Sequence, residues 1–516
     1  MIAENYKKII HLLLLTAIFA AVILPTMGRV SLWEIDEGRY LVCAQNAIDK
    51  GRWIIPEYNG RPRIAKPPLM VWLVAASSVL FNHGKVNEFT ARLPSAVAAF
   101  LTVLLLYLFI YNRLKDPDTA FFSAFVLLTS YLFVKQARFA ITDMVLLFFV
   151  TSSIFALING FEQEKRWSVI GGFILMGFGF MDKGPVAFVI PSCVVLLYLY
   201  SRQILTDSLK KRETLIGFLL FLAISVWWPL YVGKPYWEKF IIGSNVKRFA
   251  YNPSWRTSMF FYLFNFPANF FVWSAFIPVV FHLIKRKTPD ELSLFFIWFC
   301  FVFVLFSISD TKRSSYILPL YPAAAAITGW ALNRLKPLEN RLTEFERTCR
   351  ISKTLLFTSL AAIGVSGFGK ILLKTFSLDW LFTILAVSAV YAFILYVLRE
   401  KTVKLFLSAA LGFALIYTNV YQPLADKAFH SPKYCSSMIK EAVKDGPLFV
   451  YGSIRANELF YINREIHKLD LSEKARTKGV YVYTRKPRKF EKRFPHAEKI
   501  LCCSYQKETL CLYKLK

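Results

Sequence analysis

The sequence is short of acidic residues and lacks the short motifs of several enzyme classes. It has 34 Asp and Glu against 63 Lys and Arg. Its eight cysteines form no C-x-x-C pair and its six histidines form no H-E-x-x-H, so zinc fingers and zinc proteases are not indicated. A P-loop, a dinucleotide-binding glycine fingerprint and a Ser–His–Asp signature are also missing. The function therefore lies outside the nucleotide-binding, metalloprotease and serine-hydrolase classes.

Apolar residues, by contrast, are abundant, at 56% of the chain, with 17% aromatic. Apolar runs recur with lengths near the ~20 residues that cross a bilayer as a helix. The net charge of +29 would suggest nucleic acid in a soluble protein, but much of it falls in short loops between these runs, so we expect no nucleic-acid partner. The runs predict a polytopic α-helical membrane protein with about thirteen transmembrane helices, at residues 9–27, 93–111, 119–134, 143–160, 167–181, 185–201, 214–231, 263–284, 291–308, 316–333, 354–373, 379–397 and 403–420.

Residues 67–82 decide the topology. They are apolar but short for a span and begin with Pro67-Pro68, which favours a helix lying in the membrane interface. If they do not cross, every cytoplasmic loop is basic, as the positive-inside rule requires. Those loops contain Arg113 and Lys115; Lys165 and Arg166; Arg202, Lys210, Lys211 and Arg212; residues 285–287; residues 334–353; and Arg399, Lys401 and Lys404. The sequence thus predicts a cytoplasmic N-terminus and one long external loop, residues 28–92.

After Tyr421 the chain becomes polar and basic. Residues 422–516 contain short β-like runs at 448–451, 479–484, 499–505 and 510–515, and they are long enough for a small α/β domain. An odd number of spans places this domain in the periplasm, after a transmembrane domain of residues 1–421. Cys503 and Cys511 flank residues 506–508, so they either pair in an oxidising compartment or remain two free buried thiols.

This topology brings five polar segments to the external face, at Asp36, residues 138–143, 182–185, 232–262 and 310–316. Asp36 and Glu37 are adjacent, so their side chains point in different directions, one towards a site and the other towards structure. They are not a facing pair of the glycosidase kind. We predict Asp36 as a general base or orienting group and Asp143 as a second catalytic carboxylate. Each residue also fits a structural role as a helix cap.

Cations on the external face are informative about a ligand, because Lys and Arg are normally rare on that side of a membrane protein. Arginine can bind a phosphate with two hydrogen bonds, and lysine acts as a point charge. Any single cation could instead extend to a lipid headgroup, and a tyrosine could belong to the aromatic belt. As a set they indicate a phosphate-bearing membrane substrate. The predicted binding residues are Glu37, Arg39, Lys66, Arg138, Lys183, Lys247, Arg248, Lys312, Arg313 and Tyr316.

The motifs, taken in order, resemble those of bacterial GT-C glycosyltransferases. They are most similar to the family that transfers 4-amino-4-deoxy-L-arabinose from undecaprenyl phosphate to lipid A, and they also resemble protein O-mannosyltransferases. The matching segments are Asp36-Glu37-Gly38-Arg39-Tyr40, residues 51–56, Asn59-Gly60, Lys66-Pro67-Pro68-Leu69, Arg92-Leu93-Pro94-Ser95, residues 138–143, Lys183-Gly184-Pro185 and residues 312–319.

The resemblance implies a GT-C fold in the inner membrane and an inverting sugar transfer on the periplasmic face. The donor would be a sugar on a polyprenyl phosphate such as undecaprenyl phosphate, and the acceptor a lipid A-like lipid or a glycan. The resemblance implies Asp36 and Asp143 as the catalytic pair, and Arg39, Lys66, Lys183 and Tyr316 as the lining of the phosphate pocket. We expect a monomer among membrane lipids, with no cofactor besides the donor.

Two departures from the family pattern concern a metal site. The family has Glu where this chain has Ala65, and His where it has Asn245. Alanine has no ligand atom and an asparagine amide is a poor zinc ligand, so we predict no zinc and assign no metal ligand. The alternative is that Glu37, Glu57 or Glu88 supplies oxygen ligands to a harder cation.

Two other functions compete with this assignment. One is protein O-glycosyl transfer of the mannosyltransferase type. The other is transport or flipping of lipid-linked sugars, which would favour charges at mid-bilayer depth and repeated halves, and neither feature is evident in the sequence. The sequence leaves open which sugar and which acceptor are used, and whether Asp36 is a base or an orienting group.

Overall fold

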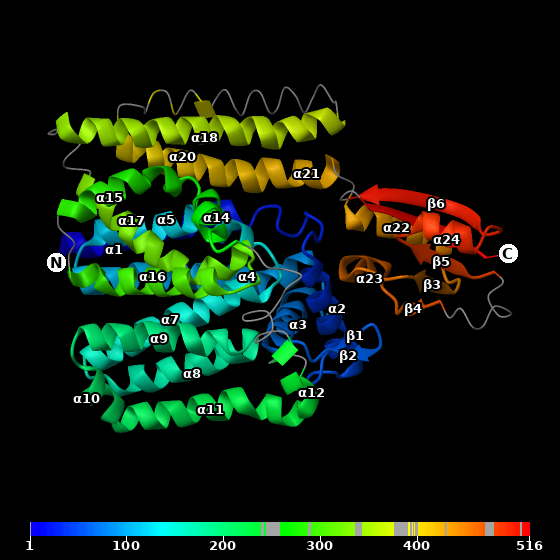
Figure 1. Ribbon diagram of the computed structural model, residues 1–516, viewed down its shortest axis with the longest axis horizontal. Coiled ribbons are helices and arrows are strands. Elements are labelled where there is room, and N and C mark those ends of the chain that lie inside the picture. The colour runs from blue at the N-terminus through cyan, green and yellow to red at the C-terminus, as the bar shows by residue number, and fades with distance from the viewer. Residues whose placement is uncertain are drawn as a thin grey trace.

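The computed structural model describes residues 2–238, 242–243, 258–286, 290–335, 343–375, 391–392, 395, 397, 401–428, 431–469, 479–505 and 508–515. Most of the chain is a bundle of roughly aligned helices, with a small α/β domain at one end (Figure 1). The helices of the bundle are α1 (Ile2–Ile23), α4 (Glu88–Leu114), α5 (Pro117–Thr129), α6 (Tyr131–Ala137), α7 (Thr142–Glu162), α8 (Arg166–Lys183), α9 (Val186–Ser201), α10 (Leu205–Lys210), α11 (Arg212–Val232), α12 (Lys234–Tyr236), α14 (Phe261–Asn269), η2 (Trp273–Phe276), α15 (Ile277–Arg286), η3 (Asp290–Leu292), α16 (Ser293–Ile308), η4 (Ser314–Leu320), α17 (Tyr321–Leu335), α18 (Thr343–Thr375), α20 (Thr402–Ile416), η5 (Tyr417–Tyr421) and α21 (Gln422–Ala428).

The long apolar helices identify a membrane protein. Among the described residues, five helices are long and apolar enough to cross a bilayer, or up to seven if two bent pairs each count as one span. The bent pairs are α5 with α6, at 65°, and α14 with residues 273–285, at 106°. Shorter apolar helices, such as α9 and α16, correspond to further spans among the thirteen that the sequence predicts. The total of thirteen spans therefore stays a prediction, and the candidate span 379–397 lies almost wholly outside the described residues.

The long loop after α1 folds at one end of the bundle. It contains α2 (Ile35–Lys50), a small hairpin of β1 (Glu57–Tyr58) and β2 (Arg61–Pro62), and α3 (Leu69–Asn82). Helix α3 has 14 residues and is therefore shorter than the ~20 residues a span needs. It lies beside α2 at the end of the bundle that carries the α/β domain (Figure 1). That residues 67–82 do not cross the membrane stays a prediction.

The α/β domain contains the strands expected from the sequence. Its helices are α22 (Pro432–Val443), α23 (Ala456–Ile462) and α24 (Pro487–Arg493). Its sheet has the order β4-β3-β5-β7-β6, in which β3 runs parallel to β4 and β5, and β7 runs antiparallel to β5 and β6. The strands are β3 (Leu448–Tyr451), β4 (His467–Lys468), β5 (Tyr481–Thr484), β6 (Glu498–Tyr505) and β7 (Glu508–Lys514).

The cysteines of this domain correct one expectation. Cys503 does not pair with Cys511; the disulfides are Cys435–Cys503 and Cys502–Cys511. The reason is the register of the β6–β7 hairpin, which places Cys502 opposite Cys511 and Cys503 opposite Leu510. Successive strand residues face opposite sides of a sheet, so Cys503 faces α22 and meets Cys435 there.

Helix α2 and the α/β domain are in direct contact. The backbone N–H of Gly38 donates to Oδ1 of Asn457 at 3.0 Å, and Nδ2 of Asn457 donates to the carbonyl of Leu32 at 3.0 Å. A Cβ atom at Gly38 would overlap the backbone of Ala456 and Asn457. Glycine is thus required here for the close approach of α2 and α23, and the α/β domain is fixed beside the first turn of α2.

Candidate functional site

A cavity of about 1290 Å³ lies where the long loop, the bundle and the α/β domain meet. Its polar wall contains Asp36 from the first turn of α2, Lys66 from the loop before α3, Asp143 from the first turn of α7, Lys183 from the last turn of α8, and Arg313. The structure thus brings four of the five expected polar segments together. The fifth, residues 232–262, falls largely outside the described residues.

Asp36 is surrounded by positive charge. Nη1 of Arg39 donates to its Oδ1 at 2.7 Å, and Nη1 of Arg313 lies 3.9 Å from its Oδ2. Burial raises the pKa of the Asp36 carboxyl, but the charges of Lys66, Arg39, Arg63 and Arg313 outweigh this effect and lower it to about 2. Asp36 is therefore ionised at neutral pH.

Asp143 forms a second ion pair in the cavity. Nζ of Lys183 donates to Oδ1 of Asp143 at 2.7 Å, and the same ammonium lies 5.6 Å from the centre of the Tyr316 ring. Asp143 is 9% exposed. The pair is largely shielded from water, and an ion pair is stronger there than at an open surface. Asp143 therefore fixes the position of the Lys183 ammonium at the cavity wall.

Seven of the sequence-predicted residues line this cavity, but Glu37 does not. It is fully buried, and its carboxylate accepts hydrogen bonds from Nε of Arg92 at 2.9 Å and from the backbone N–H of Ala140 at 3.0 Å. It also accepts from the N–H of Trp33 at 3.3 Å. These bonds join the long loop, α4 and the turn before α7. Glu37 thus makes structural contacts away from the cavity, and its expected place among the substrate-binding residues stays a prediction.

Arg138, like Glu37, does not line the cavity. Its guanidinium donates to the carbonyls of Ile23 at 2.6 Å and Pro25 at 2.7 Å, and to Oε1 of Gln422 at 2.9 Å. It satisfies carbonyl groups at the C-terminal end of α1. Its place outside the cavity follows from these contacts. Lys312 donates to the carbonyl of Ser309 at 2.6 Å and is likewise absent from the wall. Lys247 and Arg248 lie outside the described residues.

Several wall residues were not expected from the sequence. Arg63 lies 4.4 Å over the ring of Tyr40 and adds charge near Asp36. Arg63 lies between the Asn59 and Lys66 motifs, so its position in this charged loop could have identified it as a wall residue. Arg61 of β2 and the α/β-domain residues Ser453, His467 and Lys468 also line the cavity. Their position depends on how the α/β domain docks, which no local motif encodes.

The other half of the cavity is apolar. It is formed by residues of α7, α9, α16 and η4, namely Leu146, Val186, Val189, Leu305, Phe306 and Pro319. The charged wall at one end and the apolar wall between helices suit a ligand with an anionic head and a hydrocarbon chain.

The described residues contain no group of three or more His, Cys, Asp and Glu that could hold a metal ion. Ala65 lies in the cavity wall and offers no ligand atom in its side chain. The other departure, Asn245, lies outside the described residues. The absence of zinc therefore stays a prediction.

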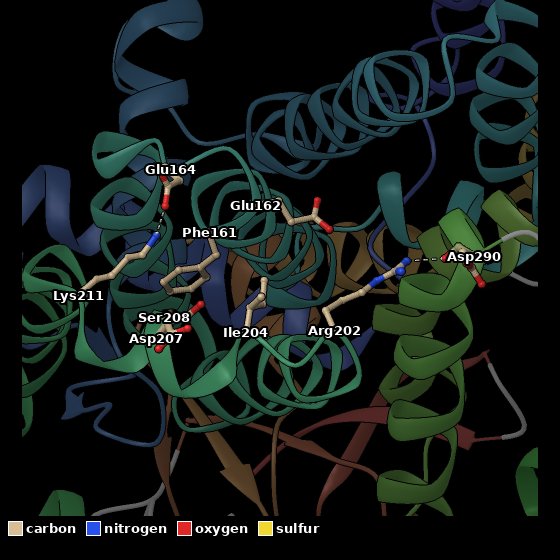
Figure 2. A pocket seen from close by; sticks show the side chains of 9 residues that line it. All are labelled: Phe161, Glu162, Glu164, Arg202, Ile204, Asp207, Ser208, Lys211 and Asp290. Atoms are coloured by element: carbon tan, nitrogen blue, oxygen red, sulfur yellow. Dashed lines mark hydrogen bonds and ion pairs between the residues drawn. The ribbon is translucent and has the colours of Figure 1, made fainter.

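A second cavity, of about 760 Å³, lies at the opposite end of the bundle, around α10 (Figures 1 and 2). Two of its cations are engaged with other groups of its wall. Lys211 donates to Glu164 at 3.2 Å, and Arg202 donates to the carbonyl of Asp290 at 2.8 Å (Figure 2). These contacts hold the loops between α7, α9, α10 and η3.

Comparisons with known proteins agree with this geometry. The family model of dolichyl-phosphate-mannose-protein mannosyltransferases matches residues 65–228. An uncharacterized protein of Aquifex aeolicus is 30% identical over 59% of this chain and 69% of its own length. The undecaprenyl phosphate-alpha-4-amino-4-deoxy-L-arabinose arabinosyl transferase of Pseudomonas savastanoi pv. phaseolicola is 30% identical over 60% of this chain. The chain spans only 57–59% of the length of such curated transferases.

A solved structure extends the likeness to the whole chain. ArnT from Cupriavidus metallidurans, bound to undecaprenyl phosphate, matches with a TM-score of 0.78 and 19% identity over 97% of both chains. The fold is therefore that of a GT-C integral-membrane protein. The chain belongs to the same family as the Aquifex aeolicus protein, and its resemblance to bacterial GT-C transferases that use polyprenyl phosphates is confirmed.

Proposed function

We propose that the protein is an inverting glycosyltransferase that moves a sugar from a polyprenyl phosphate, such as undecaprenyl phosphate, to an acceptor at the periplasmic face of a bacterial inner membrane. The observation that carries the proposal is that one cavity combines a cationic head site around Asp36 with an apolar wall between helices. This combination fits a polyprenyl phosphate, which is an anion joined to a long hydrocarbon chain.

The cations of the cavity stabilise the phosphate leaving group. In the proposed reaction an acceptor oxygen bonds to the anomeric carbon, the bond from that carbon to the phosphate oxygen breaks, and the phosphate leaves with the electron pair. Lys66, Lys183 and Arg313 stabilise the developing negative charge, with Tyr316 beside them. Because they are held in place before the reaction, they need little reorganisation at the transition state.

Asp36 acts as an orienting group in this proposal. Its pKa of about 2 makes it a weak proton acceptor at neutral pH. A carboxylate at this position can accept hydrogen bonds from the sugar and can stabilise positive charge at the anomeric carbon. The acceptor then attacks through an oxygen that is already anionic, and a phosphate on a lipid A-like lipid meets this requirement. We propose the monomer as the active unit.

Protein O-glycosyl transfer is the second candidate, favoured by the mannosyltransferase family match over residues 65–228. Both candidates share the donor. The test is transfer from a radiolabelled sugar–undecaprenyl phosphate in proteoliposomes with bacterial lipid extract and unfolded periplasmic protein. Label in the lipid fraction supports the main proposal, label in protein supports the second, and no label in either would refute both.

The proposed orientation of the protein in the membrane has a separate test. The α/β domain has two disulfides and therefore fits an oxidising periplasm. A cysteine introduced at Asn82, the last residue of α3, should react with an impermeant thiol reagent applied from the periplasm. Reaction only from the cytoplasm would overturn the proposed topology.

A further inference from the structure

The α/β domain forms part of the wall of the same cavity, through Gly452, Ser453, Ile454 and the two residues of β4, His467 and Lys468. Arg61 of β2 is also part of the wall. Two cations from different domains thus reach one opening. Neither of these cations is among the four whose charges lower the pKa of Asp36, namely Lys66, Arg39, Arg63 and Arg313.

The hairpin and β4 are held together by a specific contact. Asn59 Nδ2 donates to the carbonyl of Ile466 at 2.9 Å, and Asn59 Oδ1 accepts from the N–H of Ile466 at 2.9 Å. Lys50 adds ion pairs to Glu57 at 2.8 Å and to Glu465 at 2.5 Å. Arg61 and Lys468 each follow this contact by two residues, so the docking that joins Asn59 to Ile466 brings both cations to the mouth.

Neither of these cations is neutralised within the described residues. Arg61 and Lys468 are exposed and have no carboxylate partner there. Glu465, three residues before Lys468, is engaged by Lys50, and Asp470, two residues after Lys468, lies outside the described residues. Two other cations of the wall, Arg39 and Lys183, each pair with a carboxylate. Two unpaired cations at the mouth of a site leave positive potential directed at an incoming ligand.

We propose that Arg61 and Lys468 form an acceptor subsite, which selects acceptors that bear an anionic group in addition to the one that receives the sugar. This inference rests on the proposed function for its use in turnover. His467 and Ser453 supply neighbouring hydrogen-bonding groups. The α/β domain is on this view a specificity element of the transferase, because its removal would take away one side of the subsite.

The test uses full-length protein in nanodiscs and two probes, a diacylated disaccharide with one phosphate and its counterpart with two. Binding is measured directly, so the result does not depend on turnover. The native protein should bind the bisphosphorylated probe about fivefold more tightly than the other. Lys468→Gln and Arg61→Gln should each reduce that preference to less than about twofold, while Lys468→Arg should keep it.

Lys499→Gln is the matched control, because Lys499 is a lysine of the same domain that pairs with Glu491 at 3.2 Å and does not line the cavity. This variant should keep the native preference. Undecaprenyl phosphate should bind all variants equally, which shows that they are folded. A preference that persists in Lys468→Gln and Arg61→Gln, or one that the native protein lacks, would overturn the inference. Absence of sugar transfer with the binding preference intact would refute the proposed function alone.

Discussion

Asp36 and Glu37 are consecutive residues of α2, yet Asp36 lines the cavity while Glu37 is fully buried and accepts a 2.9 Å hydrogen bond from Arg92. Arg92 also donates to the carbonyls of Met27 at 2.6 Å and Ser31 at 2.9 Å. One carboxylate therefore holds the loop in place, and the other faces the cavity.

Glu37→Gln should destabilise the protein rather than act on the chemistry alone. Removing one partner of a buried ion pair leaves the other charge uncompensated and costs about 3–5 kcal/mol. We expect a clear fall in the thermal midpoint in detergent. Lys499→Gln, which removes one partner of an exposed ion pair, is the control that keeps a native midpoint. A Glu37→Gln protein of native stability that cannot turn over would instead place Glu37 in the reaction.

Gly38→Ala should disturb the docking of the α/β domain. A methyl group there would overlap the backbone of Ala456 and Asn457, and backbone atoms cannot rotate away as a side chain can. We expect faster proteolysis between the bundle and the domain, measured by limited digestion. Gly171→Ala is the control, because its Cβ would meet no atom within 4 Å. Equal protease resistance of both variants would contradict the close contact.

The pH profile of transfer should show no acidic limb from Asp36 between pH 5 and 8. Its pKa is lowered from 3.8 to about 2, so the carboxylate is ionised throughout that range. The stabilisation it gives the folded state is complete above pH 3.8 and is lost only as pH falls through about 2. An acidic limb within pH 5–8 that shifts in Asp36→Glu would assign the titration to this residue and contradict the orienting role.

Much of the site could be predicted because its charged residues stand at the ends of apolar runs. Asp143 and Lys183 are examples, since the polar end of each span marks the face on which it lies. Sequence could not separate Arg138 from this set, because a cation that binds backbone carbonyls at the end of α1 has the same local pattern as one that binds a phosphate.

The remaining wall residues and the disulfide pairing could not be predicted, because they depend on tertiary contacts. Lys468 reaches the cavity mouth only because Asn59 joins the hairpin to Ile466, more than 400 residues away in the chain. The disulfide pairing similarly followed from the register that sets Cys502 opposite Cys511. Helix existence could be read from composition, since burial in lipid requires long apolar runs, whereas bends such as that between α5 and α6 could not.

Transfer activity should survive metal chelation. Ala65 cannot coordinate a metal, and the described residues contain no cluster of three or more candidate ligands. We expect full transfer in EDTA and no stoichiometric zinc by elemental analysis of the purified protein. Stoichiometric zinc with EDTA-sensitive transfer would show that a metal site exists, and loss of transfer restored by magnesium or calcium would indicate a harder cation held by oxygen ligands.

The most direct test of the account compares turnover and donor binding in Asp36→Asn. The substitution keeps the shape of the side chain and removes its charge. Asp36→Asn should bind undecaprenyl phosphate within about threefold of the native affinity and transfer sugar at least about 100-fold more slowly, because the carboxylate acts in the transition state. Native transfer by a well-folded Asp36→Asn protein would contradict the central claim.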